Sequence, residues 1–189
     1  MNILYLKEAT RIGDELLRTA QSDEHGLSWE TQGIDLNSRI FWQKSEDIYS
    51  GVSGIALFLL SLYQATQKKK YLSASEEAMR WVKWYCKNHP TENYAFLTGR
   101  MGVAYVFFKL YEVTRNKSYR QQSLTIARSC TSYLKGSDTL CEFINGISGT
   151  LLVLLYLHSV AKEVWLLDII EQYVQELIKN ARYGNVGLY

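Results

Sequence analysis

The chain has little proline and little cysteine. Among 189 residues there is a single proline, Pro90, and three cysteines, Cys86, Cys130 and Cys141. An odd number of cysteines without a Cys-x-x-Cys pair fits neither a disulfide framework nor a self-contained zinc knuckle. Strand-like alternation is also scarce and is confined to short isolated stretches such as SRIFWQ, residues 38–43. These absences favour an all-α protein.

No strong basic cluster and no secretory signal are present. The formal net charge is only +2, whereas a nucleic-acid binder normally carries a stronger basic patch. The one run of lysines, residues 68–70, lies between helical segments and is typical of a solvated turn. The N-terminal stretch MNILYLKEATRIGDELL carries charge from Lys7 onward and predicts an amphipathic helix rather than a signal peptide. We expect a cytoplasmic protein with no nucleic-acid partner.

A Gly-x-x-Gly pair followed by an apolar run occurs three times, at intervals of 48 and 47 residues. The register extends beyond the glycines, because nine residues after each second glycine stand Tyr63, Tyr111 and His158. We predict an N-terminal helix and connecting segment over residues 1–44, followed by three repeats over residues 45–189. The repeats occupy about 45–92, 93–139 and 140–182. The glycines are Gly51, Gly54, Gly99, Gly102, Gly146 and Gly149.

Each repeat is predicted to hold two helices. The first begins at the second glycine, as in GIALFLLSLYQAT, and is apolar on nearly every side, which is typical of a helix buried all round. The second, as in YLSASEEAMRWVKWYCK, has one apolar and one charged face. Inner buried helices paired with outer amphipathic ones predict an array of helical hairpins. Such an array either extends as a solenoid or closes as an α/α toroid.

The uncharged run of residues 143–161 raises the alternative of a membrane helix. However, the run contains two glycines, Asn145 and His158, and the equivalent helix of the second repeat contains Lys109. Since the repeats are copies, they should share one environment. We therefore predict no membrane span.

The glycine pairs do not form a phosphate-binding motif. A P-loop has four residues between its glycines and then Lys followed by Ser or Thr, and none of the three copies has this pattern. No predicted strand precedes the pairs, which also excludes a dinucleotide fingerprint. Glycine at a helix start instead permits a positive φ and a close approach of neighbouring backbone. We interpret the pairs as structural, allowing the inner helices to crowd around a common axis.

Polar residues recur in the loops that precede the glycines, where function concentrates on repeat scaffolds. In a closed toroid these loops surround the mouth of a central cavity. The structural alternatives are helix capping, since Ser, Thr and Asn are favoured N-caps, and a solvated or loop-bonding role for the acidic residues. The loop-tip candidates are Asp47, Tyr49 and Asn145, together with Glu142. Four residues before each first glycine stand Asp47, Ala95 and Glu142, and one residue before it stand Ser50, Thr98 and Asn145.

The segments DIYSGVSGIALFLLSLY and LCEFINGISGTLLVLLYL resemble the first and third repeats of the lanthionine cyclase (LanC-like) family, especially of cyclase domains in bifunctional lanthipeptide synthetases. The resemblance runs from about Ser45 to the C-terminus. It implies an α/α toroid in which two cysteines and a histidine bind zinc. It also implies addition of a peptide cysteine thiolate to dehydroalanine or dehydrobutyrine, which forms a thioether ring.

The sequence departs from this family pattern at the metal site. The family's zinc ligands lie in Trp-Cys-Tyr-Gly and Cys-His-Gly stretches of later repeats, and neither stretch occurs here. Near the end of the chain, Gly184 and Gly187 repeat the glycine spacing without a following apolar helix. The chain resembles the N-terminal half of a cyclase domain, so we expect no metal ligands in it and zinc only in a full-length member. One family position carries over, an acidic residue near the metal in the third repeat, which here is Glu142.

Three hypotheses for function follow. The first is a fragment or truncated member of the cyclase family, inactive alone, whose uncovered inner-helix surface predicts a homodimer or a missing C-terminal half. The second is a helical-repeat module that binds a peptide without catalysis. The third is a carbohydrate-active α/α toroid that uses Asp47 and Glu142 as paired carboxylates. Aromatic residues near the loop ends would suit peptide contact; they are Trp29, Trp42, Tyr49, Tyr94 and Phe96.

Overall fold

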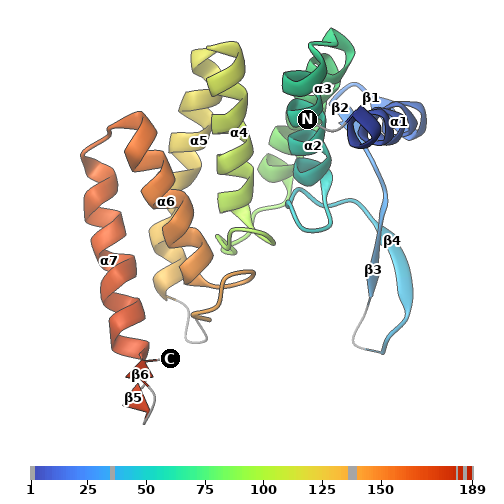
Figure 1. Cartoon of the computed structure of the whole chain (residues 1–189). Helices are drawn as coiled ribbons and strands as arrows, with labels where there is room; N and C mark the ends of the chain where they lie inside the picture. Colours follow the sequence, from blue (N-terminus) through green and yellow to red (C-terminus); the bar gives the residue numbers. More distant parts are fainter. Residues whose placement is uncertain (1–2, 35–36, 136–139, 182, 185–186, 189) are drawn as a thin grey trace. The chain divides into compact units, whose positions relative to one another are not determined.

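The computed structural model describes residues 3–34, 37–135, 140–181, 183–184 and 187–188 (Figure 1). Seven α-helices make up most of these residues, and the strands form only short two-stranded pairs, which confirms the all-α class. The chain divides into two compact units, Met1–Thr91 with Lys109–Asn116, and Glu92–Phe108 with Lys117–Tyr189. Closure into a toroid, and a boundary between residues 44 and 45, stay predictions.

The first unit begins with the predicted amphipathic helix, α1 (Ile3–Thr19), which packs against α2. Gly13 makes this contact close, because a Cβ at this position would lie 2.4 Å from Cδ2 of Leu62. A cluster of hydrogen bonds and one ion pair also joins α1 to α3. The Tyr71 hydroxyl donates to Oδ1 of Asp14 over 2.6 Å, and the Lys70 ammonium donates to the same oxygen over 2.5 Å.

Two antiparallel strand pairs follow α1, and only the last of their four strands lies within a predicted stretch. The first pair turns at Asp23, whose Oδ1 accepts hydrogen bonds from the backbone N–H groups of His25 and Gly26. Gly26 has a φ of +136°, and a Cβ there would lie 2.2 Å from the carbonyl oxygen of Glu77 in α3. The turn therefore requires glycine twice over. The strands are β1 (Gln21–Asp23), β2 (Gly26–Ser28), β3 (Thr31–Ile34) and β4 (Ile40–Gln43).

The first predicted hairpin consists of α2 (Val52–Thr66) and α3 (Lys69–Asn88), which pack against each other. The spacing of apolar and small residues predicts a face of Leu72, Ser75, Met79, Val82 and Cys86 on α3. Of these, Ser75, Met79 and Val82 are buried, and Leu72 and Cys86 are half-buried. The buried Ser75 hydroxyl donates to the Ala56 carbonyl over 2.8 Å, so this polar contact joins the two helices inside the core.

The other two hairpins are α4 with α5 and α6 with α7. Stacked rings of Phe107 and Tyr119, 6.2 Å apart, join α4 to α5, and α6 packs against α7. In the part of the chain that the structure describes, no helix combines the length and apolarity needed to cross a membrane. The elements are α4 (Arg100–Thr114), α5 (Lys117–Ser129), the 3₁₀-helix η1 (Cys130–Lys135), α6 (Ile147–Ala161), α7 (Trp165–Asn180), β5 (Tyr183–Gly184) and β6 (Gly187–Leu188).

The repeat extends to the ends of the inner helices. The residue that follows α2, α4 and α6 is in the left-handed region each time, although none of the three is glycine. Such a residue ends a helix by turning the chain, and it stands at the same register position in every repeat. These residues are Gln67, Arg115 and Lys162, with φ of 58°, 60° and 58°.

Candidate functional site

The loops that lead into the inner helices share one backbone closure. In each, the first N–H group of the helix donates to the carbonyl seven residues earlier, which folds the loop into a compact ring. We name these loops the first joint (residues 45–52), the second joint (93–100) and the third joint (140–147). The first lies in the first unit and the other two in the second. The closing bonds are Val52 N to Ser45 O, 2.9 Å; Arg100 N to Asn93 O, 3.0 Å; and Ile147 N to Leu140 O, 2.8 Å.

The glycines are needed for space and not for their dihedral angles. Gly51 and Gly146 have φ of −118° and −117°, so these helix starts do not use the positive φ that glycine permits. A Cβ at Gly54 would lie 2.2 Å from the carbonyl oxygen of Ile48, and one at Gly149 would lie 2.2 Å from that of Phe143. The close approach is thus mainly to the preceding joint of the same repeat.

Gly149 also approaches the neighbouring repeat, since a Cβ there would lie 2.8 Å from Cβ of Phe96. The N-cap residues of α2 and α6 are Gly51 and Gly146, and neither helix has a side-chain cap. The capping interpretation is therefore wrong for Ser50 and Asn145.

The acidic residue of the first joint is buried. Asp47 is 8% exposed, and its Oδ1 accepts a hydrogen bond from the Ser50 N–H group over 2.8 Å. Its own carbonyl accepts from the Gly54 N–H group over 3.4 Å. Asp47 therefore satisfies the joint's backbone, in agreement with a loop-bonding role. Tyr49, two residues later, is 67% exposed.

The acidic residue of the third joint is exposed but makes equivalent bonds. Oε2 of Glu142 accepts from the Ile144 N–H group over 2.5 Å, and Oε1 accepts from the Asn145 N–H group. The longer side chain thus reaches two backbone donors where the aspartate of the first joint reaches one. This carboxylate is committed to closing the loop while remaining open to solvent.

The second joint has no acidic residue, and Asn93 takes over its role. Ala95, which stands at the acidic position, is fully buried. Oδ1 of Asn93 accepts from the Ala95 N–H group over 3.0 Å, and Nδ2 of Asn93 donates to the Thr98 carbonyl over 3.0 Å. No repeated pattern points to Asn93, because it stands two residues ahead of the repeated acidic position.

Within the second unit the structure brings the second and third joints together at Asn145. Its side-chain oxygen accepts a hydrogen bond from the Thr98 hydroxyl, and its carbonyl accepts one from the Tyr133 hydroxyl. Burial raises the pKa of Tyr133, and the negative charge of Glu142 raises it further. Glu142, Asn145 and Tyr133 thus form one polar group, in which Tyr133 stays a neutral donor. Tyr133 comes from η1, and no sequence pattern pointed to it.

Of the five aromatic residues near the loop ends, only two are strongly exposed. Trp42 on β4 is 62% exposed, and Tyr49 in the first joint is 67% exposed. Trp29 is buried and donates its indole N–H to the Leu16 carbonyl over 2.9 Å. Phe96 packs edge-to-face on Phe143, with ring centroids 5.6 Å apart. The two strongly exposed aromatic side chains therefore both belong to the first unit, one on β4 and one in the first joint.

The cysteines do not form a zinc site within the described residues. Cys130 is buried, which raises the pKa of its thiol to about 11, and a zinc-binding cysteine needs the opposite shift. Cys141 is exposed, and its carbonyl accepts the Ser148 hydroxyl. Cys86 is half-buried at the end of α3.

The histidines have other neighbours. His25 stacks on Trp84, with ring centroids 4.0 Å apart, and His89 stacks on Tyr85 at the same separation. Nδ1 of His158 lies 3.3 Å from the Glu163 carbonyl. In the described part of the chain, no three His, Cys, Asp or Glu residues gather closely enough to hold a metal ion.

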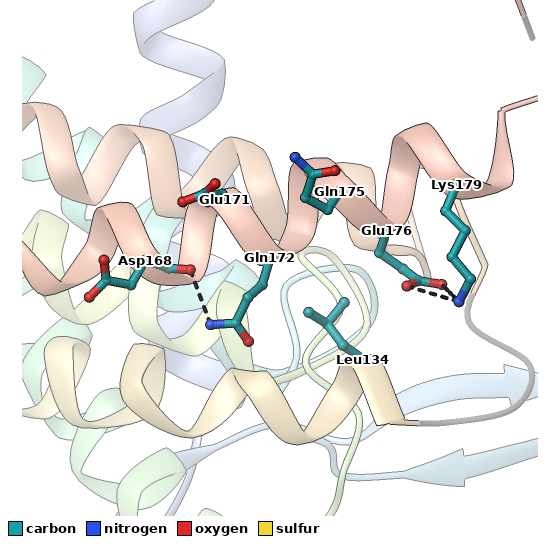
Figure 2. Close-up of a pocket in the computed structure, with 7 residues that line it drawn as sticks. All are labelled: Leu134, Asp168, Glu171, Gln172, Gln175, Glu176 and Lys179. Carbon is teal, nitrogen blue, oxygen red and sulfur yellow. Dashed lines mark hydrogen bonds and ion pairs between the residues drawn. The ribbon is translucent and has the colours of Figure 1, made fainter.

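A surface hollow of about 650 Å³ lies between η1 and α7 (Figure 2). Its lining is largely the polar and charged face of the amphipathic helix α7. The Asn180 side-chain amide, and then Lys179, hold the pKa of Glu176 below its usual value. Glu176 is paired with Lys179, and Asp168 and Glu171 are exposed, so we interpret the hollow as part of a solvated helix face. It is lined by Leu134, Asp168, Glu171, Gln172, Gln175, Glu176 and Lys179.

Comparison with known protein families gives one match, and comparison with curated proteins gives none. The matching family model is described as lanthionine synthetase C-like protein and covers residues 43–188. The match therefore includes all three joints and all three helical hairpins. The chain belongs to the lanthionine synthetase C-like family.

Proposed function

We propose that this chain takes part in thioether-ring formation on peptides by holding the peptide, and that by itself it does not close the ring. The observation that carries the proposal is the family match over residues 43–188. The chemistry of the family adds a cysteine sulfur to Cβ of a dehydro amino acid and a proton to Cα. Bound zinc would favour deprotonation of the peptide cysteine, so that its sulfur reacts as a thiolate.

Peptide holding is assigned to the exposed aromatic residues of the first unit. Trp42 and Tyr49 present large, rigid surfaces to solvent, and aromatic side chains contribute strongly to peptide contacts. Phe41 precedes Trp42 on β4 and is 42% exposed, but successive side chains of a strand point to opposite faces. The assignment therefore rests on Trp42 and Tyr49.

The role proposed for Glu142 is to position the third joint. Its two carboxylate oxygens each accept a backbone N–H group, and these two bonds hold the side chain against the joint. An acid–base role in the family's chemistry, which its sequence position implies, is retained as a second proposal. It would be tested by Glu142→Gln in any preparation that closes rings.

The experiment uses the purified chain and a synthetic linear peptide with one dehydrobutyrine and one cysteine. Ring closure leaves the peptide mass unchanged but removes its free thiol, so alkylation followed by mass spectrometry measures it directly. We expect the chain to bind the peptide while the thiol stays fully alkylatable. Zinc content, measured by plasma mass spectrometry, is expected to be well below one ion per chain.

Ring closure by a chain with stoichiometric zinc would overturn the proposed division between holding and chemistry. Absence of any peptide binding would overturn the assignment to peptide. The family match favours a peptide over a carbohydrate substrate, and no observation on the described residues favours the carbohydrate-active alternative.

A further inference from the structure

The third repeat exposes a row of large apolar residues on its inner helix and joint. Leu152 and Leu155 of α6 are 50% and 47% exposed, and Phe143 and Ile144 of the third joint are 45% and 39% exposed. An inner helix of this type is predicted to be buried on every side. We name these four residues the α6 face.

The α6 face has a covered counterpart 47 residues earlier in the chain. Leu152 and Leu155 correspond to Tyr105 and Phe108 of α4. Both of these rings contact Tyr156 of α6, with centroid distances of 5.2 Å and 5.9 Å. The residues of α4 that contact α6 therefore stand at the same positions of the repeat as the leucines of the α6 face.

The joints show the same correspondence. Phe143 and Ile144 are equivalent to Phe96 and Leu97 of the second joint. Phe96 packs edge-to-face on Phe143, and the Leu97 N–H group donates to the Ile144 carbonyl over 3.2 Å. All four positions of the α6 face thus repeat positions that contact another helical hairpin in the second unit.

We propose that a second copy of this chain covers the α6 face, in an isologous pairing of α6 with α6. In the second repeat, the equivalent surface is covered by an apolar inner helix and its joint. The α6 face is itself part of an apolar inner helix and its joint, so a second copy can provide the same kind of cover. No charged residue lies between Phe143 and Ala161, so two copies meet there without like-charge repulsion.

A head-to-tail pairing is disfavoured by the first repeat. The position that carries Tyr156 in the third repeat carries Ser61 in the first, and Ser61 is exposed. A first hairpin docked on the α6 face would therefore place a serine where the observed contact uses an aromatic ring. In the two-fold arrangement, Leu152 and Leu155 of one copy would face the same leucines of the other copy.

Analytical ultracentrifugation of the full chain over a range of concentrations tests the proposal. We expect a dimer of twice 21.9 kDa for the wild-type chain. The variant L152E/L155E should be monomeric at concentrations where the wild type is dimeric, with a dissociation constant raised about tenfold or more. Both leucines are half exposed, so the variant should keep its helical circular dichroism.

The matched control is Leu167→Glu, which introduces the same charge at a leucine of α7 that is 46% exposed and lies outside the α6 face. This control should stay dimeric. A wild-type chain that is monomeric throughout would overturn the proposal, as would a dimer unaffected by L152E/L155E or equally lost in Leu167→Glu. Masses that grow beyond the dimer with concentration would overturn the isologous geometry.

Discussion

The first and third joints have the same backbone and different side-chain chemistry. Both close through a backbone hydrogen bond between residues seven apart, and in both a Cβ added to either glycine would clash with neighbouring backbone. Asp47 closes the first joint from a buried position, whereas Glu142 closes the third from an exposed one. The second joint performs the task with Asn93. The backbone and glycines therefore define the joint, and the closing side chain is interchangeable.

The surroundings of the two joints also differ. The first joint carries Tyr49 and follows the strand that bears Trp42, both strongly exposed. The third joint carries Phe143 and Ile144, which continue the exposed leucines of α6. We therefore assign peptide contact to the first region and self-association to the third. The following predictions test these differences, beginning with the one expected to have the largest effect.

Replacing the second glycine of a joint should have the largest effect on stability. In Gly149→Ala the added Cβ meets the Phe143 carbonyl and the Phe96 side chain, so we expect a loss of about 3 kcal/mol in the free energy of unfolding. Gly54→Ala meets only the Ile48 backbone at comparable distance and should lose a similar or smaller amount.

Chemical denaturation measures both losses. Ser61→Ala, at an exposed position of α2, is the control and should change stability by less than about 0.5 kcal/mol. Glycine-to-alanine changes inside an unconstrained helix normally stabilise by up to about 1 kcal/mol. A gain of stability in Gly149→Ala would therefore contradict the packing described for the third joint.

The acidic residues of the first and third joints should differ in their contribution to the free energy of unfolding. Asp47→Ala removes a buried side chain, leaves the part-buried Ser50 N–H group without its acceptor and should cost about 2 kcal/mol. Glu142→Ala exposes its two N–H groups to water and should cost less than about 1 kcal/mol. Thermal and urea unfolding of the two variants give the comparison. Equal losses would show that burial does not distinguish the joints.

A smaller effect is expected from acid, and it should occur in both units. Hydrogen bonds from Lys70 and then Tyr71 lower the pKa of Asp14 below 3.8, and bonds from Arg120 and then Trp165 lower that of Glu163 below 4.5. Because the folded pKa is the lower one, each group stabilises the fold above its ordinary pKa. That contribution is lost as the pH falls through the folded pKa.

Between neutral pH and about pH 3, the free energy of unfolding should therefore fall less steeply in Asp14→Asn and in Glu163→Gln than in the wild type. Glu8→Gln, a substitution on the exposed side of α1, changes a carboxylate whose partner Arg11 lies on the same helix, and serves as the reference for a purely local pair. Identical acid slopes in all four proteins would contradict a role for the long-range pairs.

The helices and the repeat were predictable because their signals are local and occur in three copies. The periodicity of α3 predicts an apolar face of Leu72, Ser75, Met79, Val82 and Cys86. The structure buries Ser75, Met79 and Val82 and leaves Leu72 and Cys86 half-buried. The turn of β1 and β2 was missed, although the sequence DEHG holds an Asp and a Gly at the spacing that such a turn needs.

The candidate site was predictable only in part. The acidic positions Asp47 and Glu142 follow from the repeat, but their hydrogen-bond partners do not. Tyr133 joins the third joint from a 3₁₀-helix, and Asn93 substitutes for an acid from two residues away. Contacts of this kind depend on tertiary packing, which periodicity does not encode. For the same reason the sequence did not show which aromatic residues stay exposed.

The most direct test of the account is peptide binding compared between the two regions. Titration calorimetry with the dehydrobutyrine peptide would be run on the wild type, W42A/Y49A, and Phe143→Ala, with Tyr5→Ala as a control at a tyrosine of α1 that is 71% exposed. The account predicts that W42A/Y49A weakens binding about tenfold or more, while Phe143→Ala and Tyr5→Ala bind as the wild type does. Wild-type affinity in W42A/Y49A together with a loss in Phe143→Ala would contradict it, because the peptide would then bind at the third joint.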